Sequence, residues 1–271
     1  MNKGSVNLHK ARWKAVNRAT RRCIAVGAVL ASLSALAVCE KEKVLVVCAH
    51  PDDSIAMAGT MFLMKDKFDV HIADLTKGQA RDLSTLGRDG PQAAQRMKEE
   101  EAAASLVGAK VHWLGFQDGR LYATPEACKA VADLISEVKP RAIFSLWPID
   151  RHQDHSMAGT ITLKAATLAK FKGEFYYYEE VYGSKGFVPM HFVDVSAVAD
   201  VKRKYLRCHE SQNGGDYLLN VEMHGAKGRG YQSMYLGGND ELFAECFAPL
   251  AGFQVQGSRC IFSELPSRNE E

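Results

Sequence analysis

The feature that most constrains the fold of this chain is an alternation of short apolar runs with longer amphipathic segments. Runs typical of buried strands lie at residues 43–48, 68–75, 110–114, 142–146 and 174–179. Segments with the pattern of helices lie between them, at residues 55–65, 91–107, 125–138 and 155–170. Strands and helices in alternation indicate a parallel sheet with helices on both faces. We therefore predict an α/β fold with a mostly parallel sheet and a strand order of about 3-2-1-4-5.

The pattern is less regular beyond residue 190. A further strand is predicted at residues 191–196, followed by helices at residues 197–209 and 217–226. No internal repeat or low-complexity linker interrupts this part of the sequence. We therefore expect one domain over residues 40–265.

The first 37 residues have a different character. Residues 1–22 carry seven lysines and arginines and no acidic residue, and the apolar run that follows contains Ala35-Leu36-Ala37, a small-x-small cleavage pattern. A basic start, an apolar middle and a small-residue end are typical of an export signal. We therefore predict that residues 1–37 direct export to the periplasm or the extracellular space. A membrane anchor is the alternative, because the apolar run is slightly shorter than a membrane span.

Three details of the exported chain stay open. Arg21-Arg22 leaves a twin-arginine signal open, and Cys39 leaves a lipidated form open. Five further cysteines could form disulfides outside the cytosol, in a pairing that spacing does not define. They are Cys48, Cys128, Cys208, Cys246 and Cys260.

The charge balance of the exported part excludes one class of partner. The whole chain has 34 basic and 32 acidic residues, and the leader contains seven of the basic ones. The remainder therefore has 27 basic and 32 acidic residues, a net charge of about −5. This part lacks the basic footprint of a nucleic-acid-binding protein. It also contains neither GxGxxG nor a P-loop, so we expect no nucleotide cofactor.

Two short segments rich in His and Asp follow the first and fourth predicted strands. The first is CAHPDD at residues 48–53, and the second is SLWPIDRHQDH at residues 145–155. In an open parallel sheet, ligands bind at the carboxyl ends of the strands, where the strand order reverses. With the predicted order, this crevice lies between the first and fourth strands. The topology therefore brings the two segments together.

The residue types in these segments suit metal-assisted hydrolysis. His50 and Asp53 have HxxD spacing, and His152 and His155 have HxxH spacing. A catalytic zinc needs three ligands from His, Asp or Glu, and a carboxylate nearby to accept a proton from water. Either segment alone has a structural explanation, because an Asp after Pro often caps a helix. Both segments at one crevice favour a functional site.

Two further histidines have a simpler interpretation. His71 and His112 alternate with apolar residues on predicted strands. We therefore predict structural roles for both.

Several motifs resemble those of the PIG-L/LmbE-like family of zinc-dependent N-deacetylases. AHPDD with MAGT at residues 57–60 is similar to the first family motif, and RHQDH at residues 151–155 is similar to the HPDH motif. Weaker matches follow in the family order: RMKE (96–99), WLGFQDG (113–119), YYYE (176–179), FVDVS (192–196), HESQ (209–212) and FAECF (243–247). The resemblance covers roughly residues 43–250 and implies a Rossmann-like, three-layer α/β/α fold.

The resemblance implies a role for each matched residue of the two main segments. One Zn²⁺ per chain would be held by His50, Asp53 and His155. Asp52 would be the general base that deprotonates the attacking water. His152, oriented by Asp154, would stabilise the oxyanion or protonate the leaving amine.

The other matched positions point to substrate. The resemblance places Arg96 and Asp118 where the family binds the sugar. His209 and Gln212 would line the pocket, with a structural helix start as the alternative. The sequence departs from the family at Ser54, because the family usually has a Glu soon after HPDD, and at Gln153, which replaces a Pro. We expect these departures to alter the local geometry and the substrate more than the zinc site.

Together these features predict a zinc-dependent hydrolase that removes an N-acetyl group from an N-acetylglucosamine-type sugar or glycoconjugate. One alternative is another metal-dependent hydrolase, such as a phosphoesterase, although only one metal's worth of ligands is visible. The other is a non-catalytic carbohydrate-binding protein, although binding alone does not need an unliganded carboxylate at Asp52. The sequence leaves the acyl group, the sugar and the oligomeric state open.

Overall fold

The computed structural model describes residues 40–80, 90–180, 184–234, 242–253 and 259–266. The described residues from Lys41 onward belong to one compact unit. The export signal predicted at residues 1–37 lies outside the described residues. Within the described ranges, no helix combines the length and the apolar character needed to span a bilayer.

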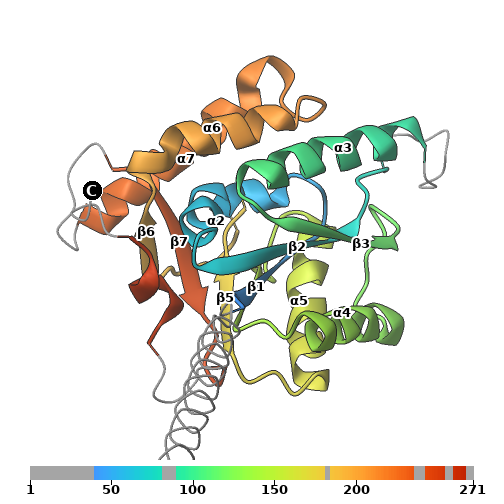
Figure 1. Cartoon of the computed structure of the whole chain (residues 1–271). Helices are drawn as coiled ribbons and strands as arrows, with labels where there is room; N and C mark the ends of the chain where they lie inside the picture. Colours follow the sequence, from blue (N-terminus) through green and yellow to red (C-terminus); the bar gives the residue numbers. More distant parts are fainter. Residues whose placement is uncertain (1–39, 81–89, 181–183, 235–241, 254–258, 267–271) are drawn as a thin grey trace, which may run out of the picture. The chain divides into compact units, whose positions relative to one another are not determined.

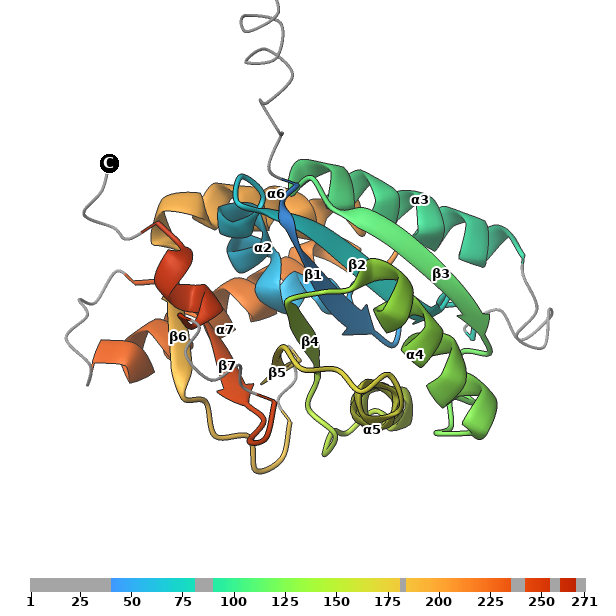
Figure 2. The same ribbon diagram turned by 60° about the horizontal axis from the view of Figure 1, so that its bottom comes forward.

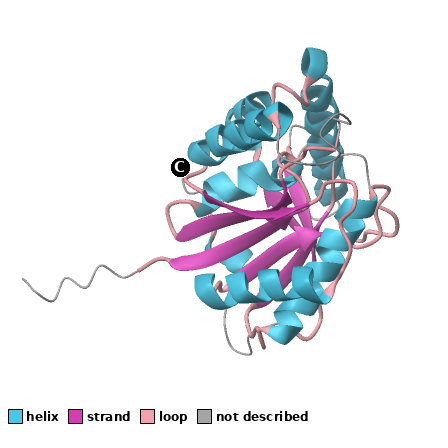
Figure 3. Cartoon of the chain, turned by 90° about the vertical axis from the view of Figure 1, so that its right-hand side faces the viewer, coloured by secondary structure: helices cyan, strands magenta, loops and turns pink. Residues whose placement is uncertain are grey.

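The described strands form a sheet in the order β3-β2-β1-β4-β5-β7-β6 (Figures 1 and 3). Their bounds are β1 Glu42–Cys48, β2 Phe68–Thr76, β3 Lys110–Phe116, β4 Ala142–Leu146, β5 Glu174–Tyr178, β6 His191–Asp194 and β7 Ala244–Pro249. The five strands β3-β2-β1-β4-β5 are parallel, whereas β7 runs antiparallel to both of its neighbours. The predicted α/β class and the order 3-2-1-4-5 are therefore confirmed.

Helices cover both faces of this sheet. The longer helices are α2 Ala58–Met64, α3 Pro91–Leu106, α4 Pro125–Val138, α5 Gln153–Leu168, α6 Ala199–Cys208 and α7 Tyr217–Met234. Short 3₁₀ helices accompany them in the described part of the chain: η1 Asp53–Met57, η3 Ser196–Val198, η4 Gly214–Asp216 and η5 Ile261–Glu264. The helices α2, α3, α6 and α7 lie on one face, and α4 and α5 on the other (Figures 1 and 2). This is the predicted three-layer arrangement.

The predicted helix boundaries are close to the observed ones because local capping signals define them. In α4, Thr124 accepts the N–H of Ala127 at 3.2 Å, and Pro125 occupies the first helical position. The segment predicted as one helix at residues 55–65 instead divides into η1 and α2. The last helix also extends further than predicted, to Met234.

Strand β7 was missed at the sequence level. It enters between β5 and β6 from the far end of the chain. Its second residue, Glu245, is fully buried and interacts with the Lys202 ammonium at 2.6 Å. A glutamate normally marks a solvent-facing position, so the pattern of the strand was hidden until its buried partner was known.

The centre of the sheet positions the two His- and Asp-rich segments. Residues Val44–Val47 of β1 are fully buried because helices cover both faces of this central strand. β1 pairs in parallel with β4, with Val47 opposite Ser145. The chain therefore leaves both strands at the same edge, and residues 48–53 and 147–155 meet there.

The predictions for the remaining histidines and cysteines have different outcomes. Nδ1 of His71 and Nε2 of His112 lie 2.8 Å apart across β2 and β3, as expected for structural residues. Within the described ranges the five cysteines are free thiols, so no disulfide joins them.

Candidate active site

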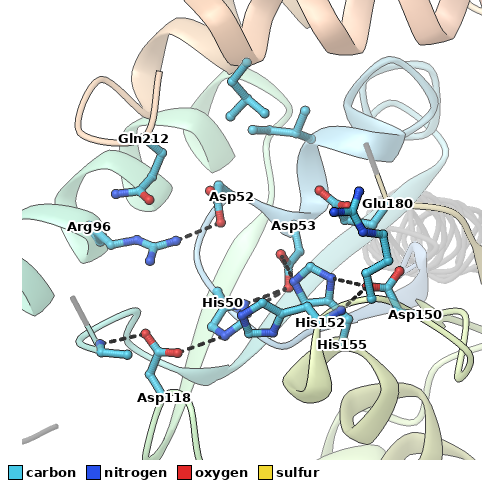
Figure 4. Close-up of a pocket in the computed structure, with 14 residues that line it drawn as sticks. His50, Asp52, Asp53, Arg96, Asp118, Asp150, His152, His155, Glu180 and Gln212 are labelled. Atoms are coloured by element: carbon cyan, nitrogen blue, oxygen red, sulfur yellow. Dashed lines mark hydrogen bonds and ion pairs between the residues drawn. The ribbon is translucent and has the colours of Figure 1, made fainter. Parts of the chain in front are cut away.

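A pocket of about 510 Å³ opens where the chain leaves β1 and β4 (Figure 4). Eight of the predicted site residues line it: His50, Asp52, Asp53, Arg96, Asp118, His152, His155 and Gln212. The structure therefore brings together residues that are far apart in the sequence. Two predicted residues, Asp154 and His209, are not among those that line the pocket.

The three predicted metal ligands are neighbours, with Asp53 between the two histidines. Oδ2 of Asp53 is 3.7 Å from Nδ1 of His50, and Oδ1 is 3.2 Å from Nε2 of His155. The tight turn fixes this carboxylate, because Oδ2 also accepts the N–H groups of Ala49 and His50 at 2.8 Å each. One donor nitrogen from each of His50, His152 and His155 lies within 4.8 Å of the others.

Carboxylates behind the histidines define which nitrogen each ring presents. Nε2 of His50 is 3.0 Å from Asp118 Oδ1 and 3.3 Å from Asp154 Oδ2. Nδ1 of His155 is 3.2 Å from Asp150 Oδ1. A carboxylate beside one imidazole nitrogen holds the proton there and leaves the other nitrogen for a metal. The nitrogens left for a metal are then Nδ1 of His50 and Nε2 of His155, which both lie beside Asp53. This donor set fits one divalent cation.

The electrostatics of the cluster also favour a cation. Burial opposes protonation of His50, yet Asp118, Asp154 and Asp53 raise its pKa well above the usual value. Burial is likewise outweighed at His155, where Asp53 and Asp150 raise the pKa to about 10. A field that holds protons this strongly also attracts a divalent metal ion.

Asp52 differs from its neighbour in conformation and in partners. Its φ of 105° is unusual for a residue other than glycine, and such conformations cost about 1–3 kcal/mol and cluster at active sites. Oδ1 pairs with Nη2 of Arg96 at 2.8 Å (Figure 4), and the backbone N–H donates to Glu100 Oε2 at 3.1 Å. Burial raises the pKa of Asp52, and Arg96 partly offsets this effect.

His152 is the residue before the first residue of α5. Its Nδ1 accepts the backbone N–H of Asp154 at 3.2 Å, so the neutral ring carries its proton on Nε2. Burial, together with the nearby His50 and His155, lowers the pKa of His152. The ring is therefore a neutral hydrogen-bond donor at the edge of the pocket.

The side chain and the backbone of Asp154 contact different histidines. It is fully buried, accepts the N–H groups of Gly119 at 2.7 Å and Leu121 at 3.2 Å, and contacts His50. Only its backbone N–H reaches His152. Asp154 thus contacts His152 through its backbone N–H, whereas its side chain orients His50.

The interpretation of His209 is corrected. It follows the last residue of α6, is 1% exposed, and its Nε2 lies 3.5 Å from Glu100 Oε2. Burial and the nearby Arg96 lower its pKa to about 3. His209 is thus a buried packing residue at a helix end, and neither a pocket residue nor a helix start, whereas Gln212 does line the pocket.

Arg96 and Asp118 line the pocket but are already engaged with protein groups. Arg96 donates to the carbonyl oxygen of Gly78 at 3.2 Å as well as to Asp52. Asp118 accepts the N–H of Ala80 at 2.8 Å and contacts His50. Both side chains are therefore part of the frame of the site, and their contact with a sugar stays a prediction.

Sequence reasoning missed three acidic residues, of which Asp150 and Glu180 line the pocket and Glu100 lies behind it. Asp150 directly precedes the RHQDH motif, so its position two residues before His152 was a usable signal. Glu100 had no such signal, because it comes from α3 and meets Asp52 only in the folded chain. The fully buried Ser54 donates to Glu100 Oε1 at 3.0 Å. A glutamate at position 54 would therefore meet a second carboxylate.

Comparisons with known proteins agree with this geometry. A family model described as PIG-L, GlcNAc-PI de-N-acetylase, matches residues 45–166. The diacetylchitobiose deacetylase of Thermococcus kodakarensis is 30% identical over 222 residues, which cover 70% of this chain and 80% of the relative. The chain belongs to the PIG-L family. The predicted family, and with it an enzyme of the N-deacetylase type, is confirmed.

Two further proteins are similar to this chain. The 4-oxalmesaconate hydratase of Pseudomonas putida is 24% identical over 193 residues, covering 64% of this chain and 74% of the relative. The crystal structure of N,N'-diacetylchitobiose deacetylase from Pyrococcus horikoshii, in complex with an inhibitor, superposes with a TM-score of 0.64. It is 23% identical and covers 77% of this chain and 84% of that one, a likeness that concerns the fold.

Proposed function

We propose that this PIG-L family member is a zinc-dependent hydrolase that removes an N-acetyl group from an N-acetylglucosamine-type sugar or glycoconjugate. The observation that carries the proposal is the convergence of His50, Asp53 and His155 in one pocket with the unliganded Asp52 beside them. The 30% identical relative, a diacetylchitobiose deacetylase, supports an N-acetylated sugar as substrate.

The donor set supports one zinc ion per chain. Two imidazole nitrogens and one carboxylate from His50, His155 and Asp53 leave a fourth position open, as catalytic zinc sites do. When bound, zinc would polarise the acetyl carbonyl and lower the pKa of its water to about 7. The carboxylates behind both histidines would keep the two rings oriented toward the metal.

Asp52 is assigned as the general base. Its Oδ1 is held by Arg96, so Oδ2 is the oxygen that takes the proton of the attacking water. Burial raises the pKa of this carboxyl, which brings its basicity closer to that needed near neutral pH. Arg96 keeps the carboxylate from rotating away from the pocket.

His152 is assigned as the donor to the developing oxyanion. Its neutral ring carries the proton on Nε2, because Nδ1 accepts the N–H of Asp154. A neutral donor of fixed orientation stabilises the negative charge of the tetrahedral state. Between the two roles predicted from the resemblance, this geometry supports oxyanion stabilisation.

The test combines metal analysis of the purified protein with acetate release from a panel of N-acetylated glycans. We expect near-stoichiometric zinc and acetate release, and we expect Asp52→Asn to keep the metal but to lose about 10²–10⁴ in rate. Asp133→Asn, an exposed aspartate on α4, is the matched control and should keep full activity. Zinc with phosphate-ester cleavage and no acetate would contradict the proposal, as would glycan binding without turnover.

The hydratase relative provides a second candidate, since a hydratase also has to activate water. The same preparation should therefore be offered 4-oxalmesaconate. Hydration of this compound without acetate release from any glycan would favour the second candidate.

We also propose that the protein is exported, which would favour envelope or extracellular glycans as substrates. The basic start, the apolar run and Ala35-Leu36-Ala37 support this. N-terminal sequencing of protein from the periplasm or the medium should give a first residue close to position 38. Full-length protein confined to the cytosol would contradict export.

A further inference from the structure

The conformation of Asp52 needs an external support. Its φ of 105° and ψ of −24° lie in a region that residues with a side chain rarely adopt. Such a conformation persists only where the surrounding structure holds it. The turn itself supplies no cap to η1, because no side-chain hydrogen bond from Asp52 closes this short helix.

Two residues of α3 hold Asp52 from opposite ends. Arg96 and Glu100 are four residues apart, so they lie on the same face of this helix. Nη2 of Arg96 binds the carboxylate of Asp52 at 2.8 Å, whereas Oε2 of Glu100 accepts its backbone N–H at 3.1 Å. Both side chains are buried, with exposures of 6% and 0%. Arg96 therefore fixes the side chain of Asp52, and Glu100 fixes its main chain.

Glu100 is itself held in place by two hydroxyl groups. Its Oε1 accepts a hydrogen bond from Ser54 at 3.0 Å and one from Tyr205 of α6 at 3.3 Å. The hydroxyl oxygens of Ser54 and Tyr205 lie 2.7 Å apart. All three residues are fully buried. Glu100 thus has a defined position from which to accept the N–H of Asp52.

We propose that Glu100 is a positioning residue that acts through Asp52: its carboxylate accepts the N–H of Asp52 and so holds the backbone conformation that aims the Asp52 carboxylate into the pocket. Glu100 is not among the residues that line the pocket. This role rests on the proposed function, in which Asp52 is the general base. It differs from that of Arg96, which contacts the Asp52 carboxylate directly.

Three substitutions of Glu100 test whether its role depends on an acceptor at the Asp52 N–H, on its charge or on its volume. Glu100→Gln keeps an acceptor at the same reach without the charge, and the hydroxyls of Ser54 and Tyr205 can turn to accept the amide hydrogens. Glu100→Asp keeps the charge but withdraws the acceptor by one methylene group. Glu100→Met keeps the volume and removes the acceptor.

We expect Glu100→Gln to retain kcat within about threefold, whereas Glu100→Asp and Glu100→Met should lose about tenfold to a hundredfold, as for a displaced catalytic group. KM and zinc content should stay near wild-type values, because neither depends on the Asp52 carboxylate. Glu101→Asp is the matched control, since Glu101 is the exposed neighbour on α3. Its kcat should be unchanged.

A double-mutant cycle distinguishes positioning of Asp52 from general support of the fold. In an Asp52→Asn background the base is absent, so Glu100→Asp should change the residual kcat by less than about twofold. A merely structural role would reduce the residual kcat by the same factor as in the wild type. Loss of zinc in Glu100→Asp, or full kcat in Glu100→Asp with loss in Glu100→Gln, would overturn the proposal.

Crystal structures of the Gln and Asp variants give a readout that does not depend on the substrate. We expect φ of Asp52 to stay positive in Glu100→Gln and to become negative in Glu100→Asp. A positive φ in both variants would overturn the positioning role, even if the wild-type enzyme deacetylates glycans. If the wild-type protein releases no acetate, the proposed function fails, and these two structures still decide the role of Glu100.

Discussion

Two groups of buried charged side chains differ in how their charges are balanced. The first, which we term the sealed cluster, consists of Lys202, Glu222, Arg229 and Glu245. Nζ of Lys202 lies 2.6 Å from Glu245 and 2.9 Å from Glu222, and Nη2 of Arg229 lies 2.7 Å from Glu222. Two cations and two anions meet with little exposure to solvent. The two positive and two negative charges of this cluster balance one another without a ligand.

The second group, which we term the pocket cluster, has an excess of acid. It consists of His50, His155, Asp53, Asp118, Asp150 and Asp154. Within the described part of the chain, none of these four aspartates forms an ion pair with lysine or arginine. The comparison teaches two things about buried carboxylates. Where lysine or arginine balances their charge, the group is structural, and where the acidic side chains are in excess, they indicate a binding site for a cation.

The largest expected effect comes from removing the metal. Dialysis against a zinc chelator should reduce acetate release by more than about a thousandfold, because metal Lewis acidity supplies several kcal/mol of transition-state stabilisation. Adding Zn²⁺ should restore the rate. Circular dichroism should show that the secondary structure survives, as expected if the sealed cluster does not depend on the metal. Undiminished acetate release from metal-free protein would contradict the conclusion that the pocket cluster holds a catalytic metal ion.

The sealed cluster should respond in stability instead. Lys202→Met leaves Glu222 and Glu245 without this ammonium, and breaking such a buried ion pair costs about 3–5 kcal/mol of unfolding free energy. Urea denaturation measures the change. Lys204→Met, an exposed change on the same helix, should stay within about 0.5 kcal/mol of the wild type. Equal stability of the two variants would show that the sealed cluster is not a structural element.

A moderate effect is expected at Asp150, which orients His155. Asp150→Asn weakens the acceptor for Nδ1–H of His155, and losses at such supporting positions are typically about 10–100-fold in metal affinity. Competition with a fluorescent zinc chelator measures this affinity. Asp133→Asn on the surface of α4 is the control. An unchanged affinity in Asp150→Asn would remove Asp150 from the pocket cluster.

A third group of buried acidic side chains, Asp74 and Glu100, sharpens the comparison because burial makes both carboxyls easier to protonate. Burial raises the pKa of both carboxyls, that of Glu100 to about 7. Neither oxygen of Asp74 has a hydrogen-bond partner among the described residues. Buried carboxyls without a cation thus stay protonated to higher pH.

The smallest expected effect is the pH dependence caused by Glu100. A carboxyl whose pKa is higher in the folded state stabilises the fold below its unfolded pKa of 4.5, and this contribution is lost as the pH rises through about 7. Wild-type stability should therefore fall relative to Glu100→Gln between these values, by at most about 1.4 kcal/mol per pH unit. Urea denaturation from pH 4.5 to 8 measures it, with Glu101→Gln as control. Parallel curves for the wild type and Glu100→Gln would contradict the assignment.

Local patterns predicted which segments supply the pocket residues, because the two His- and Asp-rich segments directly follow β1 and β4. The same patterns did not reveal the partner of the Asp154 side chain, although Asp154 follows His152 by only two positions. Successive helical residues point about 100° apart, so a side chain two positions along the start of α5 faces the other way. It therefore reaches His50 of a different segment. A motif in sequence does not state which neighbour a side chain meets.

The sequence by itself determined the alternating elements, the order of the parallel strands and the segments that carry the chemistry. These follow from periodicity and from turns, which involve residues close together in the chain. Only the tertiary structure decided which carboxylate supports which histidine, that His209 is buried, and that Glu100 holds Asp52. Most of these contacts join segments far apart in the chain, by 44 positions for Arg96 with Asp52 and by 151 for Ser54 with Tyr205. Asp150 and His155, five positions apart, are the exception. The formation of the distant contacts depends on how α3 and α6 pack, which no local pattern encodes.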